Sequence, residues 1–205
     1  MSLKITYITN ARIPTEKAHG LQIMKMCEAF ARGGCRVELV VPRKKSFVRE
    51  DAFRYYGVAN IFPIRRMFSF DLGGKTSCCA TLFFFIDLFT FLFFARFVPA
   101  VKNADIVYTR DHLLPLCLSQ KTKIVVEVHS VPRRTGLFMY ALKRASKIVV
   151  ITHGIQDVLV AHGIPTEKIT VAPDAVDPAM FDVHISREDA RKKLGVAAER
   201  RIAMY

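Results

Sequence analysis

The chain has 205 residues, 51% of them hydrophobic, and a formal net charge of +13. This composition excludes a disordered chain, and the length suffices for one large domain with a buried core. No helix-turn-helix, RNA-recognition signature or zinc-ligand spacing is present, so we expect no nucleic acid and no metal; phosphorylated substrates or anionic lipids suit the charge better. The five cysteines lack metal-binding spacing and no signal peptide is visible, which favours a reduced, cytoplasmic protein.

The beginning of the chain predicts a strand, a long loop and a helix. Residues 5–8 form an apolar run typical of a buried strand, and residues 21–32 have helical periodicity that ends at two glycines. The connection, Thr9 to Gly20, is far longer than the roughly 2–6 residues usual in α/β units. We therefore expect this loop either to serve a function or to be a mobile surface loop whose glycine caps the helix.

The rest of the chain alternates between further strands and helices. Apolar runs predict six more strands, at residues 36–42, 60–66, 105–109, 123–128, 147–152 and 168–173. Pro63 restricts the second of these six to an edge of the sheet, and residues 43–54 form a basic, polar stretch. Helical segments are expected at 112–118, 136–145 and 154–162. The alternation predicts an α/β fold with a doubly wound, mostly parallel sheet of about seven strands over residues 1–175.

Residues 78–98, "CCATLFFFIDLFTFLFFARFV", are almost long enough to cross a membrane. Asp87 opposes insertion by about 2.5–3.5 kcal/mol, and a true span would separate strands of one sheet across a bilayer. Two interpretations stay open. The segment is either a helix buried between the sheet and its neighbours, or a helix with a Phe-rich face against a bilayer or a partner.

Basic and imidazole side chains follow the predicted strands at one edge of the sheet. Ligands of open parallel sheets bind beyond the carboxyl ends of the strands, near a topological switch point. That edge gathers six such residues: Lys17, His19, Arg110, His129, Arg133 and Arg134. A helix that begins after Gly20 would direct its unpaired N–H groups toward the same edge. The sequence therefore predicts an anionic, phosphate-bearing ligand.

Several motifs, in this order and spacing, resemble the N-terminal half of a family 4 glycosyltransferase of the two-domain GT-B architecture. They are the glycine-ended loop, "ARGGCRVELVVP", "DIVYTRD", "VVEVHS", "ASKIVVITHGIQDVL" and "ITVAPDAVDPAMF". The resemblance implies a Rossmann-like domain over residues 1–175, an interdomain linker with a short helix over 176–200, and the start of a second domain at 201–205.

The resemblance also implies roles for particular residues. The loop would contact the donor's phosphates, with Gly20 allowing close approach of the backbone beside Lys17 and His19. His129 matches the family's histidine near the reacting sugar and is the candidate catalytic residue, although a lone histidine is often structural. Glu127 and Arg110 are candidates for substrate or acceptor binding; Glu127 could orient His129, or pair with a nearby arginine. We expect Gly20 and His129 at a solvent-facing edge, where substitution leaves the melting temperature nearly unchanged.

The implied reaction is transfer of a sugar from a nucleotide-sugar donor to a lipid-linked or saccharide acceptor, without a cofactor. The donor-binding half would be missing, so we expect this chain alone to be inactive. The implied location is the cytoplasm, with peripheral contact at the inner face of the membrane or self-association through residues 82–98. Two alternatives stay open: a non-catalytic Rossmann-like module that binds an anion or a partner, and a GT-B sugar-nucleotide epimerase.

Overall fold

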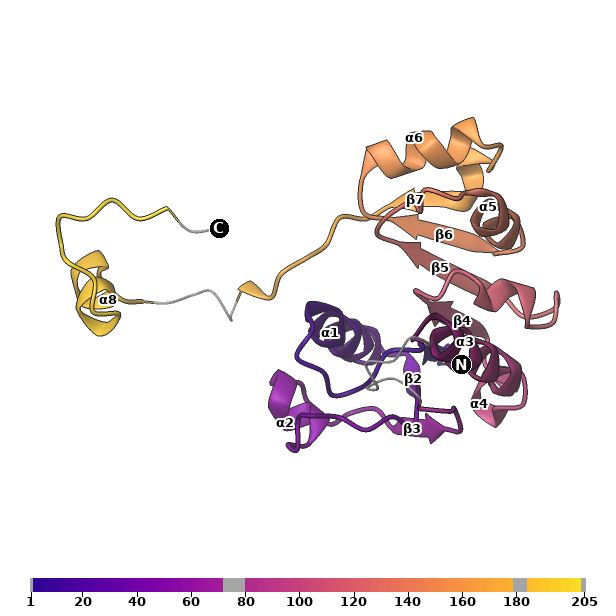
Figure 1. Ribbon diagram of the computed structural model, residues 1–205, viewed down its shortest axis with the longest axis horizontal. Helices are drawn as coiled ribbons and strands as arrows, with labels where there is room; N and C mark the ends of the chain where they lie inside the picture. The colour runs from indigo at the N-terminus through magenta and orange to yellow at the C-terminus, as the bar shows by residue number, and fades with distance from the viewer. Residues whose placement is uncertain (1, 72–79, 179–183, 204–205) are drawn as a thin grey trace. The chain divides into compact units, whose positions relative to one another are not determined.

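The structure is a computed structural model that describes residues 2–71, 80–178 and 184–203 (Figure 1). The chain divides into a large unit, Met1–Pro173, and a small one, Asp174–Tyr205. In the small unit, helix α8 (Arg187–Lys193) begins at Ser186, whose hydroxyl accepts a hydrogen bond from the Asp189 amide at 3.0 Å. Such a hydroxyl cap satisfies one of the N–H groups that a helix start leaves unpaired.

The large unit contains a seven-stranded sheet in which all neighbouring strands are parallel, in the order β3-β2-β1-β4-β5-β6-β7. The chain builds outward from β1 to β3 and then returns to place β4 beside β1, so the switch point lies between β1 and β4. This topology confirms the predicted α/β, doubly wound fold. The strands are β1 (Lys4–Ile8), β2 (Arg36–Pro42), β3 (Ile64–Met67), β4 (Ile106–Thr109), β5 (Ile124–Val128), β6 (Lys147–Val150) and β7 (Ile169–Val171).

Helices cover both faces of the sheet. Alternate residues of each strand point to opposite faces, and apolar strand residues on both faces pack against helices. One apolar core joins β1, β2 and β4 to α1 (Ala18–Arg32) and α2 (Ala52–Tyr56). The other core contains residues of every strand and of α3 (Ala80–Ala95), α4 (Pro99–Lys102), α5 (Gly136–Lys143) and α6 (His153–Ala161). Figure 1 shows α1 and α2 on one side of β2, and α3 and α4 on the other.

Two local predictions were wrong, and one short helix was not predicted. Helix α1 begins at Ala18 rather than Leu21, so Gly20 lies inside its first turn. Residues 43–54 include the beginning of α2, which Asp51 caps by accepting hydrogen bonds from the Phe53 and Arg54 amides. The expected helix at 112–118 is only a 3₁₀ turn, η1 (Leu114–Leu116), because the Pro115 ring favours the first turn of a helix over its interior. A second 3₁₀ turn, η2 (Thr166–Lys168), precedes β7.

Much of the long connection after β1 is firmly packed. Residues 13–15 are buried. The Tyr56 hydroxyl accepts a hydrogen bond from the Thr15 amide at 2.6 Å and donates one to the Thr15 carbonyl at 2.7 Å. The Arg66 guanidinium and the Ser46 hydroxyl donate to two further carbonyls of the connection, those of residues 13 and 14. The connection is therefore held in one conformation by side chains from α2, β3 and the loop after β2.

Helix α3 has one face on the sheet and one face in solvent. Its buried side chains are Phe91, Leu92 and Ala95, whereas Phe84, Phe89 and others are more than half exposed. Within the described residues of this chain, α3 is therefore not enclosed on all sides. In the part of the chain that the structure describes, no helix is both long and apolar enough to cross a bilayer. Cys78 and Cys79, at the start of the Phe-rich sequence, lie outside the described residues.

Candidate functional site

A buried carboxylate lies near the carboxyl end of β5, beside the switch point of the sheet. Glu127 is only 4% exposed. Its carboxylate accepts hydrogen bonds from the Tyr108 hydroxyl of β4 and the side-chain amide of Gln22 of α1, each at 2.6 Å, and it contacts His129 Nε2. Three elements thus converge on one carboxylate.

Gln22 extends this network to a cation. While its amide nitrogen donates to Glu127, its amide oxygen accepts a hydrogen bond from Arg110 Nη1 at 2.7 Å. Arg110 directly follows β4, so the bridge links the ends of two neighbouring strands through one helix side chain. Because Gln22 uses both ends of its amide, it fixes the separation and orientation of Arg110 and Glu127.

The network opens onto a cavity of about 160 Å³. Its lining comes from the ends of β4 and β5 and from α5: Arg110, His112, Glu127, Val128, His129, Ser130 and Phe138. The volume holds several water molecules or part of a ligand, and it is below the roughly 300–1,000 Å³ of a complete small-molecule site. The imidazole of His129 is 21% exposed, so a ligand in the cavity could reach it.

Burial and hydrogen bonding shift the pKa of the Glu127 carboxyl in opposite directions. Burial alone would raise the pKa of this carboxyl, but hydrogen bonds from Tyr108, His129 and Gln22 hold its pKa below the ordinary value. Burial and the neighbouring Glu127 charge raise the pKa of the Tyr108 hydroxyl, which therefore stays a donor. The site thus keeps a fixed negative charge in contact with His129.

A positive region adjoins this network at the start of α1. Burial lowers the pKa of the half-buried His19, and the charges of Arg110 and Lys17 lower it further. His19 is therefore neutral at neutral pH. The first turn of α1 contains no acidic side chain, so its N–H groups add to the positive potential.

Gly20 does not lie at an open helix end, as the sequence predicted, but is buried. A Cβ atom at this position would lie 2.2 Å from the Tyr56 hydroxyl oxygen and 2.7 Å from Thr15 Cγ2. The Gly20 amide already donates to the Lys17 carbonyl at 2.9 Å. The missing side chain thus leaves room for the hydroxyl that anchors the connection. The expected solvent-facing position of Gly20 was therefore wrong, and we expect substitution to lower the stability of the fold.

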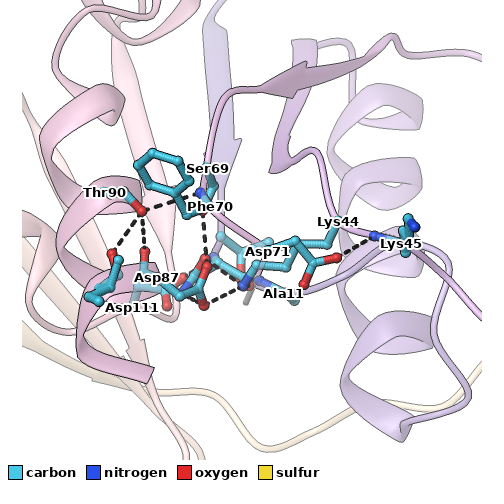
Figure 2. Close-up of polar contacts among 12 residues, drawn as sticks. Ala11, Lys44, Lys45, Ser69, Phe70, Asp71, Asp87, Thr90 and Asp111 are labelled. Atoms are coloured by element: carbon cyan, nitrogen blue, oxygen red, sulfur yellow. Dashed lines mark hydrogen bonds and ion pairs between the residues drawn. The ribbon is translucent and has the colours of Figure 1, made fainter. Parts of the chain in front are cut away.

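A second polar cluster lies at the ends of β1, β2 and β3 (Figure 2). Asp87 of α3 forms an ion pair with Lys44 at 2.7 Å and accepts a hydrogen bond from the Ser69 hydroxyl at 3.0 Å. Lys44 also donates to the backbone carbonyl and the side-chain oxygen of Asn10, at 3.1 and 3.0 Å. The cluster fastens the centre of α3 to the loops after three strands.

Of the six residues to which the family resemblance assigned roles, the structure brings together four: His19, Arg110, Glu127 and His129. Lys17 is exposed beside them, and Gly20 faces Tyr56. Sequence reasoning missed Gln22 and Tyr108, which look like ordinary helix and strand residues. Their polar side chains on otherwise apolar faces were the available signal.

The sequence profile of the family described as Glycosyltransferase Family 4 matches residues 20–180, well over half of the chain. The chain belongs to Glycosyltransferase Family 4. This confirms the resemblance drawn from the motifs. No curated protein sequence matches the chain significantly.

Solved structures show the same fold at low sequence identity. The Anabaena protein Alr3699/HepE in complex with UDP superposes with a TM-score of 0.59 at 12% identity, over 94% of this chain and 50% of that one. The lipopolysaccharide outer core galactosyltransferase WaaB superposes with a TM-score of 0.54 at 17% identity, over 85% of this chain and 46% of that one. UDP-GlcNAc 2-epimerase from Methanocaldococcus jannaschii superposes with a TM-score of 0.52 at 15% identity, over 83% of this chain and 45% of that one. The chain thus spans about half the length of the structures it matches.

Proposed function

We propose that this chain is the acceptor-side half of a glycosyltransferase that moves a sugar from a nucleotide-sugar donor to a lipid-linked or saccharide acceptor. Membership of Glycosyltransferase Family 4 supports the reaction class. The observation that carries the assignment is the network in which Glu127 contacts His129 and, through Gln22, holds Arg110 beside the cavity. It places an imidazole and a guanidinium at the edge where open parallel sheets bind ligands.

The residues take distinct roles in this proposal. His129 hydrogen-bonds the donor sugar or stabilises charge as the nucleotide departs, and Glu127 fixes the orientation of its ring. Arg110 binds an anionic group of the donor or acceptor, for which a guanidinium is well suited. Lys17, His19 and the first turn of α1 attract the donor's phosphates. Gly20 contributes indirectly, because its lack of a side chain allows Tyr56 to anchor the connection.

The first donor to test is a UDP-sugar. Structures of HepE contain UDP and UDP-glucose, and their fold is that of this chain. The proposed location is the cytoplasm, which suits the described cysteines, Cys27, Cys35 and Cys117, because none of them is in a disulfide. No cofactor is proposed.

The experiment uses the protein made from the complete coding sequence that contains this chain. It is incubated with UDP-sugars, with and without saccharide and lipid-linked acceptors, and the products are resolved by chromatography. UDP release that requires an acceptor supports transfer. Conversion of the donor sugar without acceptor would identify an epimerase, and binding without turnover would identify a binding module. The 205-residue chain alone should transfer no sugar.

A variant pair makes the experiment specific to the site. His129→Ala should abolish most of the turnover, whereas His153→Ala, which removes an exposed imidazole from the start of α6, should not. Equal losses in both variants would show that the assay does not report on the cavity at the end of β5.

A further inference from the structure

Exposed apolar side chains gather on the outer side of α3 and on the residues after β3, and we call this surface the aromatic face. Its members are 46–65% exposed: Phe68, Phe70, Leu82, Phe84, Phe85, Phe89, Phe93 and Phe97. The phenylalanine rings form two groups of contacts with centroids 5.0–6.4 Å apart, one of residues 84, 85 and 89 and one of residues 68, 70, 93, 94 and 97. Single exposed apolar residues are common on protein surfaces, but a clustered aromatic surface of this kind marks an interaction site.

The exposed charged side chains of residues 80–103 are of one sign. Residues 80–103 contain a single acidic side chain, Asp87, and it is turned toward the sheet, where it pairs with Lys44. The basic residues of the same stretch, Arg96 and Lys102, are exposed. The Lys102 ammonium lies 5.8 Å from the centre of the Phe97 ring, at one end of the face. The face therefore combines apolar side chains with exposed positive charge.

We propose that the aromatic face binds an anionic lipid surface, with its phenylalanines in the acyl-headgroup boundary and Arg96 and Lys102 at the lipid phosphates. This pairing of an apolar helix face with basic residues is what an interfacial helix requires. Anionic lipid attracts each nearby base by about 1 kcal/mol. A second copy of the chain fits less well, because the same stretch of a partner copy would offer Arg96 and Lys102 no acidic side chain except Asp87, which already pairs with Lys44.

The Asp87 cluster gives this binding a defined geometry. Asp87 contacts Asn10, Lys44 and Ser69, which lie just past the ends of β1, β2 and β3. A bound α3 would therefore hold the carboxyl edge of the sheet at a fixed distance from the lipid surface. The inference is independent of sugar transfer, since it concerns only lipid binding.

The chain has no tryptophan, so a single substitution creates a specific fluorescent reporter. We would place it on the aromatic face (Phe89→Trp) or on α5 as a matched control (Leu137→Trp); the native side chains are 65% and 59% exposed. Vesicles of phosphatidylcholine with phosphatidylglycerol that has brominated acyl chains should quench the Phe89→Trp emission and leave Leu137→Trp unchanged. Vesicles of phosphatidylcholine alone, with the same brominated acyl chains, should quench much less. Equal quenching of both reporters, or of neither, would overturn the proposal.

Flotation with the same vesicles gives the second measurement, on the chain and on the protein from the complete coding sequence. Phe89→Ser with Phe93→Ser should lower the partition coefficient at least about tenfold, and Arg96→Ala with Lys102→Ala about fivefold per base. Leu137→Ser with Tyr140→Ser is the control and should have no effect. Concentration-dependent sedimentation abolished by the Phe89/Phe93 pair, without flotation, would identify a second copy as the partner. Flotation of the chain but not of the complete protein would show that another part of that protein covers the face.

Discussion

Glu127 and Asp87 are both carboxylates held by several hydrogen bonds near the carboxyl ends of the strands, yet their partners have different surroundings. Asp87 binds Lys44 and Ser69, whose contacts join α3 to the loops after β2 and β3. Glu127 contacts His129 directly and Arg110 through Gln22, and His129 and Arg110 both line a cavity. The number of hydrogen bonds to a carboxylate therefore does not mark a functional site. What distinguishes Glu127 is that its partners face space that a ligand can enter.

The largest effect should come from His129→Ala in the protein from the complete coding sequence. We expect turnover to fall about 10²–10⁴-fold, the range for a group that acts in proton transfer or charge stabilisation. The melting temperature should change little, since the imidazole is partly exposed and packs at the rim of the cavity. Steady-state kinetics and thermal melts, with His153→Ala as the control, check this. A much lower melting temperature with normal turnover of the folded enzyme would make His129 structural.

Asp87→Ala, the corresponding substitution in the cluster around Asp87 and Lys44, should lower the stability of the protein. The side chains of Lys44 and Asp87 are only 11% and 16% exposed, so the substitution leaves an ammonium largely buried without its counter-ion. We expect the free energy of unfolding to fall by about 3 kcal/mol, as measured by urea denaturation. Replacing both partners, Lys44→Met with Asp87→Leu, should restore most of the loss. If the double variant is as unstable as the single one, the ion pair is not the cause.

The fold could be predicted from the sequence because buried parallel strands are continuous runs of valine and isoleucine. Helix α2 was missed because it has five residues, although both of its boundary signals were present. Asp51 caps its start, and Gly57, with φ of 60°, ends it in the left-handed region. The helix expected at 112–118 was predicted from apolar spacing alone. That spacing does not take account of Pro115, and only a 3₁₀ turn forms there.

The site could be predicted only in part. The positions of Arg110 and His129 followed from the strands that they terminate. The role of Gln22 could not be deduced, because it depends on the rotation of α1 against β5, 105 residues further along the chain. Gly20 was assigned to the ligand from the family resemblance, and its contact with Tyr56, 36 residues further along the chain, could not be deduced from the sequence.

Gly20→Ala should have an intermediate effect, again on stability. The new methyl group would meet the Tyr56 hydroxyl and Thr15, and overpacking of this kind costs about 1–3 kcal/mol. Tyr56→Phe removes the hydroxyl and its two hydrogen bonds to Thr15, so it should also destabilise the protein. Because both variants disturb the same contact, the double variant should lose less than the sum of the single losses. Strict additivity in urea denaturation would show that Tyr56 is not what the glycine accommodates.

The smallest effect concerns the pH dependence of donor binding at His19. Burial, Arg110 and Lys17 lower the pKa of the free imidazole below 6.5, while Glu16 acts in the opposite direction. In the free protein, stability linked to His19 is thus present above pH 6.5 and is lost as the pH falls toward the lowered value. A bound diphosphate would raise this pKa by adding negative charge, so binding should take up a proton.

UDP-glucose is a suitable probe for this coupling, because its diphosphate does not itself titrate near neutral pH. Its affinity for the protein from the complete coding sequence should rise about three- to tenfold between about pH 7.5 and about pH 5.5. His19→Gln should remove most of that rise and leave the affinity at the higher pH nearly unchanged, because His19 is neutral there. Calorimetry in two buffers of different ionisation enthalpy measures the affinity and the number of protons taken up. Unchanged proton uptake in His19→Gln would assign the coupling to another group and would separate His19 from the donor's phosphates.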